Sequence, residues 1–331
     1  MTENKQEKEE KKNFGKHIDD VDSVDLPIDQ EGRIYHIGLK KGELANRILT
    51  VGDPGRAGRI SKQLDKVCFE FQSNRGYYTY TGLKNGVPIS IVATGMGFPL
   101  VDFMVRESAE IVDGDMVFLR FGTCGVVRED IPIGNIVIST SSIMGRRDYN
   151  LVERQIKERD NSESNESYEN KWGQNKVFPY EISEEPILAN EKLCDLLEEC
   201  LGNNLGKEKV SKGLNLSADS FYSTQGRKVS TFFDHNQGFV EMVQKKFPDF
   251  TTMEMETYIY FHLAKSCVKK NIYASAACIA LAQRISGKFL KNSIRIEREK
   301  VGGLSCLEAL SKMPLEKEMS GKHCVWEKKE N

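Results

Sequence analysis

The sequence predicts one α/β domain in which a central mixed β-sheet is flanked by helices. Three observations support this prediction. Apolar segments of strand length alternate along the chain with segments of helical periodicity. Several strand-like segments end in glycine, threonine or another polar residue, as strands of such folds do. Three very polar stretches, about 80 of the 331 residues, account for much of the excess charge, and the remainder, about 250 residues, suits one α/β domain.

The predicted strands are short, apolar and rich in β-branched residues. The segment at 46–52 reads NRILTVG, and the one at 115–122 reads DMVFLRFG. In chain order, the predicted strands are 46–52, 88–94, 115–122, 135–139, 210–217 and 272–282.

Three segments between these strands predict helices. Residues 187–201 carry five leucines at helical spacing, residues 100–112 follow the motif TGMGFP, and residues 257–269 are rich in aromatic side chains. This alternation favours a mostly parallel or mixed sheet. Ligands of such folds bind beyond the carboxyl ends of strands, so polar residues at those ends are the candidates for function.

Three polar stretches lie outside the predicted domain core. Residues 1–31 are expected to form a disordered tail, because 11 of the first 20 are charged. Residues 145–176 predict a partly disordered surface insertion, either a solvated loop or an active-site lid. Residues 313–331 predict a loosely held tail whose Trp326 can dock on the domain. The domain is therefore expected to span residues 32–312.

Charge and composition exclude several classes of protein. Lys and Arg number 47 and Asp and Glu 49, so the net charge of −2 lacks the basic footprint of a general nucleic-acid binder. No run of about 18 apolar residues predicts a membrane span, and the N-terminus lacks the apolar core of a secretory signal. The eight cysteines form no CxxC pair, which is typical of reduced thiols in a cytoplasmic protein. The five histidines show no metal-ligand spacing.

Two clusters at strand ends together favour an anion site. Residues 52–56, GDPGR, form a tight turn whose free amides and Arg56 can cradle an oxyanion, although the same letters also describe an ordinary turn. Arg120 lies within an apolar strand, where its guanidinium needs either a core carboxylate or a bound anion. Thr123 and its neighbouring glycines add a hydroxyl and bare amides.

Two further clusters complete a pattern that suits a nucleoside. In FYSTQGR, Gln225 and Arg227 can offer donors to a planar polar ring on which Phe221 stacks; the alternative is a plain polar loop. Near residue 255, two acids flank a methionine just before a predicted helix. They either cap that helix or provide Glu256 to bind vicinal hydroxyls, with Met255 against a sugar ring. Anion, sugar and planar base together describe phosphate, pentose and nucleobase.

This ordered set of motifs resembles the nucleoside phosphorylases of the class that includes uridine phosphorylase and the hexameric purine nucleoside phosphorylases. The resemblance covers roughly residues 32–310. The matching residues, in family order, are His36 in YHIGL, GDPGR at 52–56, Arg75 in SNRGYY, TGMGFP at 94–99, LRFGTCG at 119–125, FYSTQGR at 221–227, MEMET at 253–257 and Gln283-Arg284.

The resemblance implies roles for the matching residues. Those expected to bind phosphate are Gly52, Arg56, Arg75, Arg120 and Thr123. Those expected to bind ribose are His36, Met255 and Glu256, and those expected to bind the base are Phe221, Gln225, Arg227 and Arg284. Arg120, Glu256, Gln225 and Arg227 are the expected catalytic residues. Arg75 and His36 are implied to serve the site of a neighbouring subunit.

The resemblance is nearest to the uridine-specific branch. Purine enzymes of the class carry an acid near the position of Ala282 that protonates the purine N7, whereas Ala282-Gln283-Arg284 contains none. The nucleosidase relatives, which use water, lack the arginines that match Arg56 and Arg120. The implied reaction is reversible phosphorolysis of uridine to uracil and ribose 1-phosphate through an oxocarbenium-like transition state. The alternatives are a purine or broad-specificity phosphorylase and a non-catalytic nucleoside-binding relative.

The resemblance also bears on cofactors and partners. Phosphate is a co-substrate, and no metal or organic cofactor is implied. Gly76 replaces an acid that helps hold a monovalent cation in bacterial relatives, which argues against that cation site. Two smaller departures are Gln283-Arg284 for Asn-Arg and Thr123-Cys124 for Thr-Thr. A homodimer is the expected minimal unit, hexamers are common in the family, and neither nucleic acid nor a membrane is an expected partner.

Overall fold

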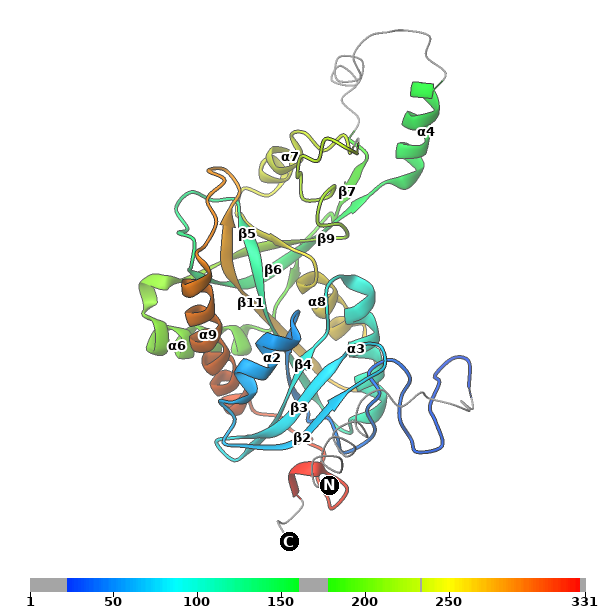
Figure 1. Ribbon diagram of the computed structural model, residues 1–331, viewed down its shortest axis with the longest axis vertical. Coiled ribbons are helices and arrows are strands. Elements are labelled where there is room, and N and C mark those ends of the chain that lie inside the picture. The colour runs from blue at the N-terminus through cyan, green and yellow to red at the C-terminus, as the bar shows by residue number, and fades with distance from the viewer. Residues whose placement is uncertain (1–22, 161–177, 233, 328–331) are drawn as a thin grey trace, which may run out of the picture.

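A mixed β-sheet runs through the middle of the structure, with helices against both of its faces (Figure 1). The computed structural model describes residues 23–160, 178–232 and 234–327. In chain order, the strands are β1 (Arg47–Val51), β2 (Lys66–Gln72), β3 (Tyr78–Lys84), β4 (Val87–Ala93), β5 (Met116–Val126), β6 (Ile136–Arg147), β7 (Tyr180–Ile182), β8 (Ile187–Leu188), β9 (Val210–Ala218), β10 (Phe250–Glu254) and β11 (Ile272–Gln283). Their main path is β10-β9-β6-β11-β5-β1-β4-β3-β2, and β7 and β8 pair with β6.

The sheet combines parallel and antiparallel pairs, as predicted. Strands β4, β1, β5 and β11 run parallel to one another, whereas β6 is antiparallel to β11 and β2-β3-β4 form an antiparallel meander. Strand β10 is parallel to β9 but also pairs antiparallel with β5, through Met253 and Gly125. This additional pairing joins β5, β11, β6, β9 and β10 into a closed ring of strands. The closure brings the end of β10 beside β5.

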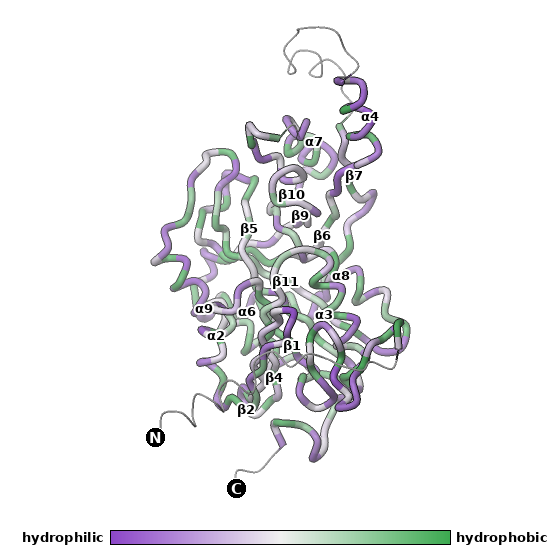
Figure 2. The backbone as a smooth tube through the Cα atoms, turned by 45° about the vertical axis from the view of Figure 1, so that its right-hand side comes forward, coloured by the Kyte–Doolittle hydropathy of each residue, from purple (hydrophilic) through white to green (hydrophobic). Residues whose placement is uncertain are grey.

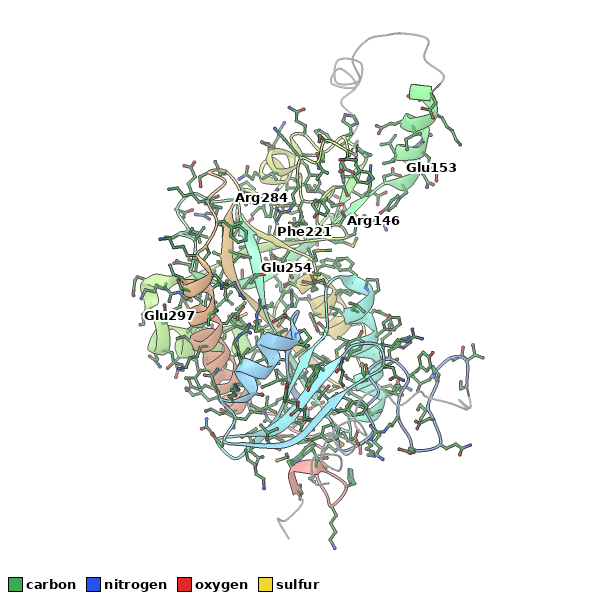
Figure 3. The ribbon with its side chains drawn as sticks, viewed as in Figure 1. Arg146, Glu153, Phe221, Glu254, Arg284 and Glu297 are labelled. Carbon is green, nitrogen blue, oxygen red and sulfur yellow. The ribbon has the colours of Figure 1, made fainter. Side chains whose placement is uncertain are left out.

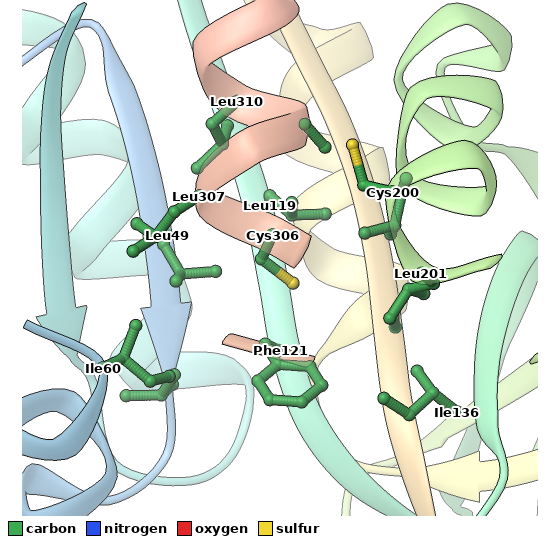
Figure 4. Packing of buried hydrophobic residues seen from close by; sticks show 14 of the residues in the cluster. Leu49, Ile60, Leu119, Phe121, Ile136, Cys200, Leu201, Cys306, Leu307 and Leu310 are labelled. Atoms are coloured by element: carbon green, nitrogen blue, oxygen red, sulfur yellow. The ribbon is translucent and has the colours of Figure 1, made fainter. Parts of the chain in front are cut away.

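Most of the helices cover the two faces of the sheet in two groups. In chain order they are α2 (Pro54–Ser61), α3 (Phe98–Ile111), α4 (Tyr149–Asp160), α6 (Glu191–Leu205), α7 (Phe239–Lys246), α8 (Thr257–Ser266) and α9 (Asn292–Lys312). Side chains of α2, α6 and α9 pack with Leu119 and Phe121 in one core cluster (Figure 4). Those of α3 and α8 pack with Phe118 in a second cluster. Strand β5 contributes side chains to both clusters, because successive side chains of a strand point to opposite faces of the sheet.

The predicted strands are all present, but several boundaries and elements differ from prediction. The predicted helix at 187–201 begins only at Glu191, because the side chain of Asn190 caps it by accepting from the Leu193 amide at 3.0 Å. The β2–β3 hairpin and helix α9 were not predicted. Helix α9 is hard to recognise because Gly302 and Gly303 lower its helical propensity.

The C-terminal segment is held more firmly than the expected loose tail. Met319 and Cys324 are buried, and Trp326 packs against the second core cluster. Arg47, buried at the start of β1, donates to the carbonyl of Met313 at 2.8 and 3.1 Å and pairs with Glu318. A buried guanidinium needs such partners, so it holds the segment in place. Residues 1–22 and 328–331 lie outside the described residues.

The expected insertion at 145–176 begins with ordered structure. Strand β6 continues to Arg147, and α4 follows it and extends away from the sheet (Figure 1). Hydrophilic residues predominate along α4, whereas the strands of the sheet are mostly hydrophobic (Figure 2). The rest of the insertion, 161–177, lies outside the described residues, so the loop and lid interpretations both stay open. Within the described residues, no helix combines the length and apolar character needed to cross a bilayer.

Candidate active site

Arg120 lies within β5, and its guanidinium is almost fully buried. Its Nε donates to Glu254 Oε2 at 3.1 Å, and its Nη2 donates to Glu256 Oε2. Burial acts to lower the pKa of Arg120, but attraction to Glu256 and Glu254 outweighs it and holds the pKa above its ordinary value. The remaining group, Nη1, is buried and makes no hydrogen bond within the described residues. Arg120 is therefore a permanent cation with one unsatisfied donor.

Glu254, the last residue of β10, is held by several donors. Its Oε1 accepts from Asn215 Nδ2 at 2.7 Å and from Ser217 Oγ at 2.5 Å. The amide of Glu256 and that of the next residue donate to the same carboxylate at 2.9–3.1 Å. Burial raises the pKa of Glu254, but Arg120 and these donors bring it below its ordinary value. Glu254 thus caps α8 and also pairs with Arg120.

Glu256 stands at the N-cap position of α8, with its carboxylate 2% exposed. Its Oε1 accepts from the amide of Gly97 at 2.7 Å, while its Oε2 pairs with Arg120. Burial raises the pKa of Glu256, and the charge of Glu254 adds to this effect against the attraction of Arg120. Met255, half-buried, lies between the two acids. The two acids therefore differ: Glu254 has many donors, whereas Glu256 has few.

The predicted turn at 52–56 is the start of helix α2. Asp53 is the N-cap residue, and its Oδ1 accepts from the amide of Arg56 at 2.7 Å. Gly52 is partly exposed, and a Cβ built on it would lie 3.4 Å from the carbonyl oxygen of Gly95. The helix start therefore lies against the loop of the TGMGFP motif.

Arg56 is buried and lies near Arg120. Its Nε donates to Glu299 Oε1 at 3.1 Å, and its Nη1 donates to the carbonyl of Phe121 at 3.3 Å. Burial lowers the pKa of Arg56 and repulsion from Arg120 lowers it further, although Glu299 opposes both. Thr123 follows Arg120 by three residues in β5 and is half-buried. Two guanidinium groups thus share one buried region, which suits an anion.

The loop at 221–227 is shaped by hydrogen bonds to its own backbone. Thr224 Oγ1 donates to Asp219 Oδ1 at 2.5 Å, and Asn236 Nδ2 donates to the carbonyls of Ser223 and Arg227 at 3.0 and 2.9 Å. Gln225 is 2% exposed. Its backbone carbonyl accepts from Arg284 Nη2 at 2.5 Å, so this loop and the end of β11 meet.

Two arginines with few partners gather at this loop. The guanidinium of Arg227 lies 3.8 Å from the centroid of the Phe221 ring, and its Nε is buried without a hydrogen bond in the described structure. Burial, with a contribution from Arg284, lowers the pKa of Arg227 to about 10. Burial also lowers the pKa of Arg284. A Cβ built on Gly125 would lie 2.9 Å from Arg284 Cδ, so this arginine reaches β5. Glu254, Phe221 and Arg284 lie at one end of the sheet (Figure 3).

His36 and Arg75 are connected through Tyr35, which both residues contact. Arg75 Nη2 donates to Tyr35 Oη at 2.8 Å, and Tyr35 contacts the His36 ring edge-on. His36 Nδ1 lies 2.5 Å from Glu107 Oε1, and its ring stacks on Phe103. The structure thus holds Arg75 on Tyr35, and His36 on Glu107 and Phe103.

A family comparison places these motifs in context. The model of the phosphorylase superfamily matches residues 46–299, which is most of the chain. The chain belongs to the phosphorylase superfamily. The resemblance to nucleoside phosphorylases inferred from the sequence is thereby confirmed.

Similar proteins include two kinds of phosphorylase. The chain is 30% identical to the uridine phosphorylase of Thermococcus kodakarensis over 312 residues, which is 92% of this chain and 96% of that protein. It is 34% identical to the DeoD-type purine nucleoside phosphorylase of Oceanobacillus iheyensis over 122 residues, or 36% of this chain and 52% of that protein. A solved structure from a study of two diverse uridine phosphorylases of Phytophthora capsici is 35% identical. It covers 87% of this chain and 97% of its own, with a TM-score of 0.77. The predicted phosphorylase fold is confirmed.

Sequence reasoning missed three acids that support this superfamily site. The sequence suggests Glu254 only as a helix cap and gives no reason to select Glu107 or Glu299. Glu107 lies 71 residues from His36 in the chain, and Glu299 lies 243 residues from Arg56. No local pattern marks these acids, because a buried acid becomes informative only once its arginine or histidine partner is found beside it.

Proposed function

We propose that this chain is a uridine phosphorylase that cleaves uridine with phosphate to give uracil and ribose 1-phosphate. The observation that carries the proposal is the buried guanidinium of Arg120, which has an unsatisfied Nη1 and holds the carboxylate of Glu256. One residue thereby joins an anion site to a carboxylate that can accept from sugar hydroxyls. The names of the relatives from Thermococcus kodakarensis and Phytophthora capsici support the same reaction.

Phosphate is held by arginines in this proposal. Arg120 offers Nη1. Arg56 lies beside it, in the first turn of α2, where the N-terminal end of the helix favours an anion. Gly52 and Thr123 add a backbone amide and a hydroxyl. Arg75 of a neighbouring subunit completes the site. A phosphate dianion bound there lies ready to attack the ribose as the bond to the base breaks.

Ribose is gripped by Glu256, which accepts hydrogen bonds from the 2′- and 3′-hydroxyls, and it packs against Met255. His36 of a neighbouring subunit reaches the 5′-hydroxyl. Its Nδ1 is engaged by Glu107, which leaves Nε2 for the substrate. Positive charge develops on the ribose in the oxocarbenium-like transition state, so the carboxylate and the phosphate stabilise it more than they stabilise the ground state.

The leaving base is stabilised by Gln225 and Arg227, with Phe221 stacked against it and Arg284 close by. Negative charge grows on uracil as the glycosidic bond breaks, and a partly desolvated guanidinium favours that charge. Gln283 supports a pyrimidine preference, because its amide is committed to the carbonyl of Arg128 at 2.8 Å and it offers no acid to a purine N7. No step in this scheme uses a cofactor.

A direct assay tests this proposal. Incubation with uridine and phosphate should release uracil and form ribose 1-phosphate in equal amounts, measured by chromatography. Omitting phosphate should stop the release. Uracil formed at an equal rate without phosphate would contradict phosphorolysis, and uridine binding without turnover would favour a non-catalytic binder. Inosine and thymidine in the same assay test the purine or broad-specificity alternative, which the DeoD-type relatives keep open.

A shared site predicts complementation between inactive variants. Arg75→Ala and Arg120→Gln should each be inactive, whereas the two co-expressed should recover about a quarter of the wild-type rate, because one site of each mixed dimer is intact. Co-expressed Arg120→Gln and Glu256→Gln provide the control: both residues belong to the same subunit, so every mixed site is defective. Activity of Arg75→Ala alone, or no recovery in the first mixture, would contradict a shared site.

A further inference from the structure

Glu299 has an unusual set of partners for a buried acid. It lies on α9, and its carboxylate is 0% exposed. Arg56 Nε donates to its Oε1 at 3.1 Å, Arg59 donates to its Oε2 at 2.6 and 3.1 Å, and Arg295 donates to its Oε1. One carboxylate thus meets three guanidinium groups.

Neutralising a buried charge does not require all three arginines. The side chains of Arg59 and Arg295 are 41% and 29% exposed, and each pairs with Glu299 from the solvent side. Either one balances the charge of the carboxylate. Arg56 is different because it is 7% exposed and points inward, where the carbonyl of Phe121 accepts from its Nη1. The Glu299 contact therefore determines the orientation of Arg56.

The sequence of α9 allows this contact by close packing. Gly302 and Gly303 follow Glu299 by about one helical turn. A Cβ on Gly302 would lie 2.3 Å from Phe121 Cζ, and one on Gly303 would lie 2.6 Å from Ile60 Cγ1. The two glycines thus let α9 approach β5 and α2 closely enough for the Glu299 carboxylate to reach Arg56.

We infer that Glu299 is a positioning residue for phosphate: it fixes the guanidinium of Arg56 from the side of α9 so that its free edge faces the anion. The inference rests on the proposed function, in which Arg56 binds phosphate. Without this contact, Arg56 has to be ordered when phosphate binds, and this cost weakens phosphate binding. Uridine does not contact Arg56 in the proposal, so its binding is unaffected.

Glu299→Gln tests the inference in the full-length protein. The KM for phosphate is expected to rise about tenfold or more, while the KM for uridine changes less than about twofold. Arg295→Ala is the matched control, since it removes a solvent-side partner of the same carboxylate, and its KM for phosphate should stay within about twofold of wild type. An unchanged KM for phosphate in a folded Glu299→Gln protein overturns the inference.

A double-mutant cycle and a binding measurement separate positioning from general destabilisation. Calorimetric titration with inorganic phosphate should show weaker binding in Glu299→Gln than in wild type, and no further weakening when Glu299→Gln is added to Arg56→Gln. Additive losses in the cycle would overturn the inference. Glu299→Asp keeps the charge if the glutamine variant does not fold, and its shorter side chain should still weaken phosphate binding. The titration measures phosphate binding and needs no turnover. If the proposed reaction is wrong, the wild-type protein binds phosphate in the titration but does not cleave uridine in the assay, so the two failures can be told apart.

Discussion

Arg120→Gln is expected to lower the phosphate-dependent cleavage of uridine by about a thousandfold or more. The substitution removes the buried donor Nη1, which binds phosphate in the proposed function, and the cation that pairs with Glu256. Glutamine is polar but shorter, supplies no charge and cannot make the paired contacts of a guanidinium. Steady-state rates with phosphate and uridine varied separately measure the loss.

Folding has to be separated from catalysis in this variant. Loss of Arg120 leaves Glu254 and Glu256 buried without their cation, which costs about 3–5 kcal/mol if both stay ionised. Thermal unfolding therefore accompanies the kinetics, and Arg120→Lys provides a charged variant that should fold better yet remain strongly impaired. Arg128→Gln is the control, because Arg128 is an exposed arginine paired with Asp130. Activity near the wild-type level in folded Arg120→Gln would contradict its assignment.

Glu256→Gln is expected to lower kcat/KM for uridine by about a hundredfold to a thousandfold, because two charge-assisted hydrogen bonds to the ribose become neutral ones. The loss should be much smaller with 2′,3′-dideoxyuridine, which lacks both hydroxyls. Comparing kcat/KM for the two substrates in wild type and variant measures this difference. Glu153→Gln, on the exposed surface of α4 (Figure 3), is the matched control. Equal losses for both nucleosides would show that Glu256 acts elsewhere than at the hydroxyls.

The pKa of Glu256 predicts how the activity changes as the pH is lowered. Only the ionised carboxylate accepts from both hydroxyls, and burial raises the pKa of Glu256 above its ordinary value. Activity should therefore fall, as the pH decreases, at a higher pH than for an exposed glutamate. A pH series of kcat/KM for uridine should show this fall in wild type and a flatter profile in Glu256→Gln.

Several parts of the fold could be predicted from the chain alone. The apolar runs of β1, β4, β5 and β11 carry their strand signal in composition, because a strand buried on both faces needs mostly apolar side chains. Arg120 was recognisable as unusual because a charge inside such a run is costly. Helix α9 was missed because its two adjacent glycines conceal a helix whose packing depends on them.

The candidate site shows where sequence reasoning stops. For Arg120, the sequence left open whether its partner is a carboxylate or an anion. The structure shows two carboxylates, Glu254 and Glu256, and one remaining donor. The pairing of β10 with β5 makes this arrangement possible, and no local pattern in either strand encodes that pairing.

Short motifs and apolar periodicity are local properties of the chain, so the fold class, the motif order and most of the residues proposed to touch substrate could be predicted from them. The partners of the buried charges could not: Glu254 and Glu256 hold Arg120, Glu299 holds Arg56, and Glu107 holds His36. A buried charge must find its partner in space, and the chain supplies that partner from segments up to 243 residues away.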